Sequence, residues 1–368
     1  MRVVVTGAGG FIGKNLRVPL AQRRDLEVVP ITRGCAEADL EQAIRTADVL
    51  IHLAGINRPK DPIEFTTGNI DLTRRVIDTL QQTDRKIPVA FASSVQTGRE
   101  TPYGLTKRAA EEALFAHGEK HQCPVRVYRL PNVFGKWCRP NYNSVVATFC
   151  HNLARGLPIE IHDPSAELSL VYIDDVVCEL IRFIDCKDVV SGFGEVRPVY
   201  TITVGRLAEQ IAAFREVRST LITERVGEGL LRALYATYVS YFRPSQFSYR
   251  VPKYDDSRGT YVEMLKTKDS GQFSFFTAAA GITRGGHFHH TKTEKFLVLK
   301  GNARFRFRDI LTDESFELLA NGDEPTIVET IPGWAHDITN IGKDELVVML
   351  WANENFDKQR PDTHSHRV

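Results

Sequence analysis

Short apolar runs alternate with helix-like segments over the first part of the chain. The runs are rich in β-branched residues and lie at 3–5, 28–31, 49–53, 89–92 and 125–130. Between them, apolar residues recur with helical spacing, as in 72–80 and 107–116. Strands that alternate with helices predict βαβ units. We therefore expect an α/β, Rossmann-type doubly wound parallel sheet with helices on both of its faces.

The pattern changes near residues 240–256, where Pro244 and Pro252 follow a helical pattern over 207–241. The later apolar runs are short, at 273–276, 296–299, 303–308 and 346–350. Apolar and basic residues alternate strictly over 303–308, which predicts a strand with one buried face. Closely spaced strands with Gly and Asp turns favour an all-β barrel or sandwich. We expect an α/β domain over 1–244 and a β-barrel domain over 245–368.

Composition narrows the functional classes. The 368 residues are 42% hydrophobic and 25% charged, as in ordinary globular proteins. Lys and Arg number 47 and Asp and Glu 46, so net charge gives no general attraction to nucleic acid or anionic membranes. The six cysteines form no Cys-x-x-Cys pair, and no apolar run has the roughly 20 residues of a membrane helix. These features predict a cytoplasmic protein with reduced thiols and neither a nucleic-acid nor a membrane partner.

A glycine-rich turn follows the first predicted strand and opens a helix, over Thr6–Gly13. Gly7, Gly10 and Gly13 allow the backbone to approach a pyrophosphate, whose charge lies at the helix N-terminus. A tight turn that binds nothing is the alternative. The next strand ends at Arg33 with no acid for a ribose 2′-hydroxyl, which favours NADP(H) over NAD unless Arg33 is a solvated loop charge.

A serine pair and a Tyr-Lys pair follow downstream. Ser93 and Ser94 precede Tyr103 and Lys107, which stand four residues apart and so share one face of a helix. A nearby ammonium favours the tyrosinate and is expected to lower the pKa of Tyr103, which makes the phenol a better proton donor to a nascent alkoxide. The alternative is that Tyr103 and Lys107 are ordinary surface residues with this spacing by chance.

These motifs resemble the extended branch of the short-chain dehydrogenase/reductase superfamily, which acts on nucleotide sugars. The resemblance covers about residues 1–240 and includes 51–55, Asn69, 129–135 and 172–176. It implies that Ser94 polarises the substrate carbonyl, Tyr103 donates the proton and Lys107 holds the nicotinamide ribose, with Ser93 as an alternative serine. The remaining implied contacts are to the cofactor, from Gly7, Gly10, Phe11, Ile12, Gly13, Arg33, Asp39, Leu40, Leu53, Ala54, Gly55 and Asn69, and to the sugar diphosphate, from Asn132. The short gap between Ser94 and Tyr103 predicts a trimmed substrate loop, and His52 is interpreted as a packed core residue.

The second half carries a histidine–glutamate pattern. His287 and His289 alternate on one predicted strand and so face the same way, and Glu294 and His336 are expected from neighbouring strands. Three imidazoles and one carboxylate suit Zn²⁺, Fe²⁺, Ni²⁺ or Mn²⁺. We expect Zn. The alternative is a cluster of surface histidines or a barrel without a metal.

The spacing of Gly281, the four ligands, Gly301 and Asn340 resembles the two cupin motifs, of which the second is condensed because Pro332 and Gly333 are adjacent. We interpret His290 as lying outside the ligand set. His364 and His366 lie in a polar tail after Pro361, and we expect that tail to be frayed.

The order of the two halves resembles the CapF-type bifunctional enzymes of bacterial capsule and O-antigen synthesis. The resemblance implies a UDP-2-acetamido-2,6-dideoxy-4-hexulose substrate on the route to UDP-N-acetyl-L-fucosamine. The cupin would epimerise C3 and the reductase would then reduce the C4 ketone with NADPH, giving the 6-deoxy-L-talose sugar. His290, Lys295 and Glu263 are candidates for the cupin base, and strand-edge pairing of cupins predicts a homodimer.

Two other functions stay open at this point. One is a monofunctional NADP-dependent 4-keto-sugar reductase in which the cupin metal is structural. The other is a non-enzymatic NADP-sensing protein with a ligand-binding cupin. The complete set of Ser94, Tyr103 and Lys107 argues against the sensor, because a sensor needs no proton donor.

Overall fold

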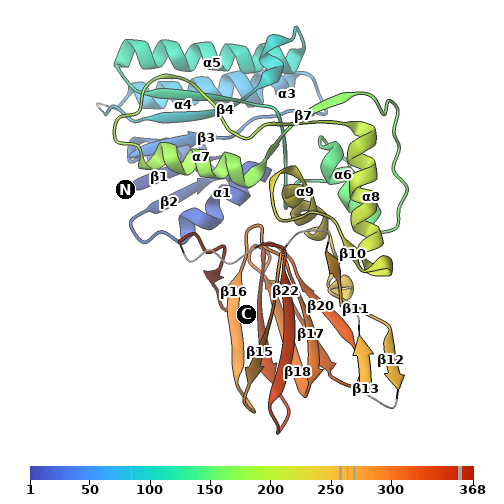
Figure 1. The fold of residues 1–368 in the computed structure, drawn as a ribbon. Helices are drawn as coiled ribbons and strands as arrows, with labels where there is room; N and C mark the ends of the chain where they lie inside the picture. The colour runs from blue at the N-terminus through green and yellow to red at the C-terminus, as the bar shows by residue number, and fades with distance from the viewer. Residues whose placement is uncertain (84, 257–258, 263, 268–270, 355–358) are drawn as a thin grey trace. The chain divides into compact units, whose positions relative to one another are not determined.

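The computed structural model describes residues 1–368 except 84, 257–258, 263, 268–270 and 355–358 (Figure 1). The chain forms two compact units. Unit 1 is Met1–Ser144 with Glu167–Ile202, and unit 2 is Val145–Ala166 with Thr203–Val368. This division groups segments by compactness, whereas the boundary expected at 244/245 separates two fold families. That boundary stays a prediction.

Unit 1 is built on a parallel sheet of six strands in the order β2-β1-β3-β4-β5-β8. Figure 1 labels the first four of these strands. The strands are β1 (Arg2–Thr6), β2 (Glu27–Ile31), β3 (Val49–His52), β4 (Val89–Ser94), β5 (Val125–Leu130) and β8 (Gly192–Gly194). The residues of β3 are all buried, as expected of a strand covered on both faces. Because β1 lies between β2 and β3, the strand order reverses there, and ligands of such sheets bind beyond the carboxyl ends of the strands at this point.

Helices connect the strands of unit 1. They are α1 (Phe11–Ala21), α2 (Glu37–Arg45), α3 (Ile63–Phe65), the π-helix η1 (Thr66–Asp71), α4 (Leu72–Gln81), the 3₁₀-helix η2 (Val95–Gly98), α5 (Pro102–His121) and α7 (Ile173–Asp185). A smaller sheet has the order β6-β7-β9, with β6 (Asn132–Phe134), β7 (Glu167–Tyr172) and β9 (Tyr200–Thr203). The expected alternation of strands and helices is confirmed.

In its described residues, unit 2 combines three α-helices with two antiparallel five-stranded sheets. The helices are α6 (Val145–Ala154), α8 (Val204–Thr220) and α9 (Gly229–Val239). One sheet has the order β11 (Ser248–Arg250), β20 (Thr326–Thr330), β17 (Glu294–Lys300), β22 (Leu346–Ala352) and β15 (Gln272–Ala278). The other has the order β19 (Ser315–Asn321), β18 (Asn302–Asp309), β21 (Trp334–Asn340), β16 (Thr283–Phe288) and β23 (His364–Ser365). Short additional elements are β10 (Ile222–Thr223), η3 (Pro244–Gln246), β12 (Lys253–Asp256), β13 (Gly259–Val262) and β14 (Lys266–Thr267).

The barrel strands follow the predicted pattern. Along β18, Ala303, Phe305 and Phe307 are buried while the arginines between them are partly exposed. Two facing antiparallel sheets with such inward apolar rows give the barrel its core. The expected all-β second half with a cupin-like architecture is confirmed.

The expectation of a frayed C-terminal tail is wrong. His364 and Ser365 form β23, which pairs with β16, and the backbone N–H of His366 donates to the Gly286 carbonyl at 2.9 Å. Asp362 accepts hydrogen bonds from the backbone N–H groups of His290, Thr291 and Lys292. These bonds to a distant loop hold the polar tail, and composition alone does not reveal them.

Candidate functional site

The glycine-rich turn has no room for side chains at two positions. Gly7 has a φ of +69°, and a Cβ added there would lie 2.6 Å from the backbone N of Ala54. A Cβ on Gly13 would lie 2.4 Å from the carbonyl oxygen of Gly7. Helix α1 then begins at Phe11 with no acidic residue in its first turn. The turn therefore leaves exposed backbone and a positive helix end for a pyrophosphate.

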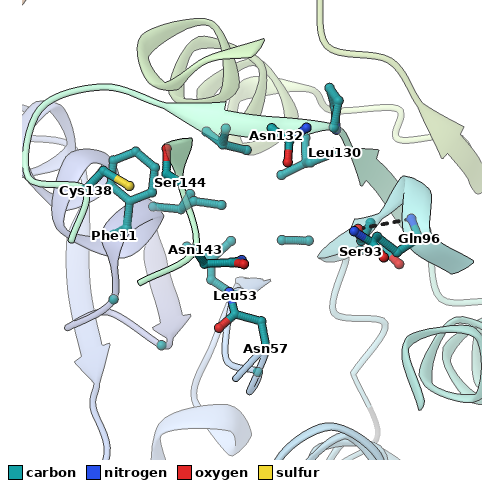
Figure 2. A pocket seen from close by; sticks show the side chains of 18 of the residues that line it. Phe11, Leu53, Asn57, Ser93, Gln96, Leu130, Asn132, Cys138, Asn143 and Ser144 are labelled. Atoms are coloured by element: carbon teal, nitrogen blue, oxygen red, sulfur yellow. Dashed lines mark hydrogen bonds between the residues drawn. The ribbon is translucent and has the colours of Figure 1, made fainter. Parts of the chain in front are cut away.

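A cavity of about 790 Å³ opens beside this turn (Figure 2). In the view of Figure 2, Ser93 and Gln96 lie on one side, and Phe11, Cys138 and Ser144 gather on the opposite side. The cavity collects residues from the carboxyl ends of four neighbouring parallel strands, β1, β3, β4 and β5, as the strand order requires. The sequence-predicted residues that line it are Gly7, Gly10, Phe11, Ile12, Gly13, Leu53, Gly55, Ser94, Tyr103, Lys107 and Asn132.

The other predicted cofactor residues lie around the cavity rather than in its wall. Asn69 is buried, and its side-chain amide bonds to both the N–H and the C=O of Ile56, so it fixes the loop after β3. The Ala54 N–H donates to Thr6 Oγ1 in the same loop. Leu40 packs in the hydrophobic core, and Asp39 is exposed on α2.

Arg33 is exposed just beyond β2. Its neighbour Thr32 would meet a Cβ on Gly9 at 3.4 Å, so the end of β2 lies beside the glycine turn. Among the residues that the structure describes, Arg33 has no hydrogen-bond or ion-pair partner on its side chain. Its guanidinium is therefore available to an anionic ligand.

Tyr103 and Lys107 lie on α5 and line the cavity with Ser94. Burial raises the pKa of Tyr103, and a hydrogen bond with Ser94 opposes that rise. The expectation of a lowered pKa for Tyr103 is wrong. The pKa is raised because desolvation of the phenolate outweighs the other effects. The phenol is protonated at neutral pH, as an ordinary tyrosine is.

Lys107 is a buried cation. Its Nζ donates to the Ala92 carbonyl at 2.7 Å and lies 4.2 Å from the centre of the Phe91 ring. Burial lowers its pKa to about 7, although the charge of Glu111 acts in the opposite direction. His52 is fully buried between Thr6 and Thr73, as expected of a core residue.

The two serines differ in their contacts. Ser94 Oγ accepts from the Gln96 N–H at 3.2 Å and is hydrogen-bonded to the phenol of Tyr103. Ser93 Oγ is buried in the cavity wall without a hydrogen-bond partner among the described residues. The contact with Tyr103 favours Ser94 as the catalytic serine, which stays a prediction.

Sequence reasoning did not find one wall of the cavity. Residues 137–139 and 142–144, with Lys14, Gln96 and Arg99, also line it. In this loop Trp137 and Asn141 adopt positive φ angles of 65° and 52°. Such angles are uncommon in residues other than glycine and often mark functional loops, but the sequence gives no sign of them.

The predicted metal ligands converge in the barrel of unit 2. One donor atom from each of His287, His289, Glu294 and His336 lies within 4.8 Å of the others. Glu294 Oε2 is 3.2 Å from His289 Nε2 and 3.4 Å from His336 Nε2. The ligands come from β16, from the loop that follows it, and from β17 and β21. This donor set and spacing fit a first-row divalent cation.

The protonation states also suit a cation. Burial and the neighbouring imidazoles lower the pKa of His287 to about 3, and burial lowers that of His336. Burial alone would raise the pKa of Glu294, but its hydrogen bonds with His289 and His336 hold that pKa well below its usual value. Neutral imidazoles beside an ionised carboxylate are the forms that bind metals.

The groups around the ligands orient them. His289 Nδ1 donates to the backbone carbonyl of Asp362, which leaves its Nε2 for the cluster. Asn340 bonds to the carbonyls of Ala278 and Asp344 and so has a structural role.

Two of the three candidates for the cupin base lie within the described residues, and their surroundings differ. Lys295 follows Glu294 on β17 and therefore faces the opposite side, where it pairs with Glu329 and contacts Tyr249. The Glu329 carboxylate raises the pKa of Lys295 although burial acts against it. His290 is outside the ligand set and packs on His364, with ring centres 4.7 Å apart. Glu263 lies outside the described residues.

Together, these features define a class: a Rossmann-type oxidoreductase unit in one chain with a cupin-like metal-ligand barrel. The chain belongs to the NAD dependent epimerase/dehydratase family, which it matches over residues 3–192. Residues 254–364 match the polysaccharide biosynthesis C-terminal domain family. Within the described residues, no helix has the length and apolarity to cross a membrane, and all six cysteines are free thiols.

Two relatives match along the whole chain, and a third matches part of it. The UDP-2-acetamido-2,6-beta-L-arabino-hexul-4-ose reductase of Pseudomonas aeruginosa is 56% identical over 368 residues, covering 100% of this chain and 99% of the relative. The crystal structure of the capsular polysaccharide assembling protein CapF from Staphylococcus aureus aligns with a TM-score of 0.69 and 38% identity, covering 100% of both chains. The UDP-glucose 4-epimerase of Thermus thermophilus with NAD covers 58% of this chain and 83% of that one at 23% identity and a TM-score of 0.51, which indicates the fold alone.

Proposed function

We propose that the chain is a bifunctional nucleotide-sugar enzyme. Its barrel epimerises C3 of a UDP-2-acetamido-2,6-dideoxy-4-hexulose, and its Rossmann unit reduces the C4 ketone to give UDP-2-acetamido-2,6-dideoxy-L-talose. The observation that carries the proposal is the presence of two candidate sites in one chain, the cavity lined by Ser94, Tyr103 and Lys107 and the cluster of three histidines and a glutamate. Similarity to a UDP-4-keto-sugar reductase along the whole chain supports the substrate class.

NADPH is the proposed reductant. The turn over Gly7–Gly13 would hold its pyrophosphate, because added Cβ atoms at both ends of the turn collide with backbone. The loop over 53–55, fixed by Asn69, would form the next part of the binding surface, with Asp39 and Leu40 on the adenine side. Arg33 would pair with the 2′-phosphate as an exposed guanidinium beside the turn.

Side chains of the protein would supply and position the proton that the reduction needs. When bound, NADPH would supply the hydride. Tyr103, a phenol that is protonated at neutral pH, donates its proton to the developing C4 alkoxide. Ser94 would hold the phenol and the substrate oxygen in one hydrogen-bonded arrangement, and the buried Lys107 would hold the nicotinamide ribose. Asn132, which lines the cavity, would contact the sugar diphosphate.

The barrel would act before the reduction. The C4 carbonyl acidifies the C3 proton, so a base can remove it to give an enediolate, and return of a proton to the other face inverts C3. His287, His289, Glu294 and His336 would hold a divalent cation, with Zn²⁺ proposed, which would stabilise developing negative charge as a Lewis acid. Reduction at C4 then removes the carbonyl that makes C3 labile and fixes the configuration.

The test is one incubation of the purified chain with a UDP-4-keto-6-deoxy-HexNAc in deuterated water, followed by NMR. Without NADPH we expect deuterium at C3, and with NADPH a product reduced at C4. Reduction without exchange would instead identify a monofunctional reductase with a structural metal. Absence of both reactions in metal-loaded protein would overturn the proposed substrate class.

The assembly and location of the protein are also proposed. Cupins commonly pair through strand edges, so we expect a homodimer, which light scattering measures directly. Six free thiols fit a reducing, cytoplasmic compartment.

A further inference from the structure

A second cavity lies within unit 2, with a volume of about 570 Å³. Its wall is formed by the end of α6, the last two turns of α8 and the segment that follows α9. It shares no described lining residue with the cavity beside the glycine turn. Neither the proposed reduction nor the proposed epimerisation uses it.

Four arginines line this cavity: Arg155, Arg215, Arg218 and Arg243. No Asp or Glu is among its described lining residues. Two of the four arginines already make contacts within the protein. Arg155 donates to the Tyr241 carbonyl at 2.9 Å, and Arg218 donates to the Gln246 carbonyl at 2.6 Å, pairs with Glu329 and stacks on Phe242.

Arg155 and Arg218 also lie at the C-terminal ends of α6 and α8, where a cation complements the helix dipole. That structural role does not extend to the other two arginines. Arg215 and Arg243 are exposed, and neither has a carboxylate partner within the described part of the chain. Three separate segments therefore bring arginines to one concave surface, and within the described part of the chain a carboxylate pairs with Arg218 but not with Arg215 or Arg243.

This arrangement has an electrostatic cost. Burial lowers the pKa of Arg155, and the nearby positive charge of Arg243 acts in the same direction, as expected where like charges lie close together. Planar guanidinium groups in a concave wall match the geometry of phosphate oxygens, which accept two parallel hydrogen bonds from one arginine. A doubly charged anion would remove the repulsion.

We propose that this cavity is a binding site for a diphosphate group, separate from the cavity beside the glycine turn. Arg218, held by Glu329 and Gln246, provides the fixed wall. Arg155 supplies charge from the end of α6, and Arg215 and Arg243 close on the anion from the rim. The volume accommodates a diphosphate together with part of the molecule that carries it.

The test is calorimetric titration of the full chain with inorganic pyrophosphate. The double variant Arg215→Gln/Arg243→Gln removes the two rim charges while leaving the buried contacts intact. We expect its affinity to fall by about tenfold or more, because two charge-assisted contacts are lost. Arg250→Gln is the matched control for lost charge, since Arg250 is paired with Glu324 in the same unit, and it should bind as the unchanged chain does.

Lys14→Gln removes a cation from the wall of the other cavity and tells the two sites apart. Full affinity in this variant, with loss in the double variant, supports the proposal. Loss in Lys14→Gln alone, equal affinity in all variants, or no binding up to about 5 mM pyrophosphate would overturn it. A parallel titration with UDP identifies the carrier: affinity above that of pyrophosphate, lost in the double variant, indicates a nucleoside diphosphate, whereas equal affinity indicates recognition of the phosphates alone.

Discussion

The two candidate sites are assembled in different ways. The cavity of unit 1 is formed by strand ends, loops and exposed backbone, and it has a volume of about 790 Å³. The cluster in the barrel is formed by side chains on strand faces, with four donor atoms within 4.8 Å of one another. The first arrangement suits a large ligand that brings its own charge. The second suits a small cation that the side chains surround.

The electrostatic environments of the two sites also differ. Lys107 is a buried cation whose pKa burial lowers to about 7. Glu294 is a buried carboxylate that stays ionised because of its contacts with His289 and His336. Burial therefore disfavours the charged form of Lys107 in unit 1, whereas contacts with histidines favour the charged form of Glu294 in the barrel.

The largest expected effect is the loss of C4 reduction without loss of C3 exchange. Tyr103→Phe removes the proposed proton donor, so NADPH-dependent reduction should fall by about 10²- to 10⁴-fold while C3 exchange continues at its normal rate. Tyr142→Phe is the matched control, because Tyr142 lines the same cavity. Cofactor oxidation and deuterium incorporation, measured on one sample, check this. Unchanged reduction in Tyr103→Phe would remove the reaction from this site.

Replacing the buried cation should stabilise the fold. The pKa of Lys107 is lowered from 10.5 to about 7, so between these values the unfolded chain binds a proton that the folded chain does not. The destabilisation therefore grows as the pH falls from about 10.5 to 7 and is constant below that. Lys107→Met should raise the free energy of unfolding at pH 7 by on the order of 3 kcal/mol, and the difference should shrink toward pH 10. Denaturant unfolding at several pH values measures it. A difference that does not change with pH would show that burial of the charge is not its cause.

We expect metal binding in the barrel to depend on the C-terminal tail, because Asp362 holds the loop that follows His289. Asp362→Ala removes the acceptor for three backbone N–H groups next to His289, and metal affinity should fall by about 10- to 100-fold. Competition with a chromogenic chelator reports the affinity. Asp313→Ala, an exposed residue paired with Arg308, serves as the control. Equal affinity in both variants would mean that the tail does not support the ligand set.

The smallest effect concerns cofactor choice. Arg33→Ser should raise the KM for NADPH by about tenfold and leave that for NADH nearly unchanged, because only the 2′-phosphate contact is lost. Arg24→Ser removes an exposed arginine before the same strand and should change neither value. Parallel changes for both cofactors would argue against a 2′-phosphate contact.

Local spacing predicted much of both sites. The glycine turn, Tyr103 with Lys107, and the four ligands lie in short motifs whose geometry follows from one helix, one strand or one turn. The contribution of Asp362 arises between segments about 70 residues apart, so no local pattern contains it. The backbone angles at Trp137 and Asn141 depend on the folded loop. The pKa of Tyr103 was expected in the wrong direction because sequence shows the nearby charge but not the burial.

The most direct test of two separate activities is a mixing experiment. Tyr103→Phe keeps the barrel cluster, and His336→Gln keeps the reductase residues while removing a metal ligand. Each variant alone, with NADPH and the UDP-4-keto sugar, should give no C3-inverted, C4-reduced product. A mixture of the two should restore that product, because the intermediate made by one variant is reduced by the other. Restored product is the result that two independent sites predict. A mixture as inactive as its parts, from folded variants, would contradict the division of the reaction between the two sites.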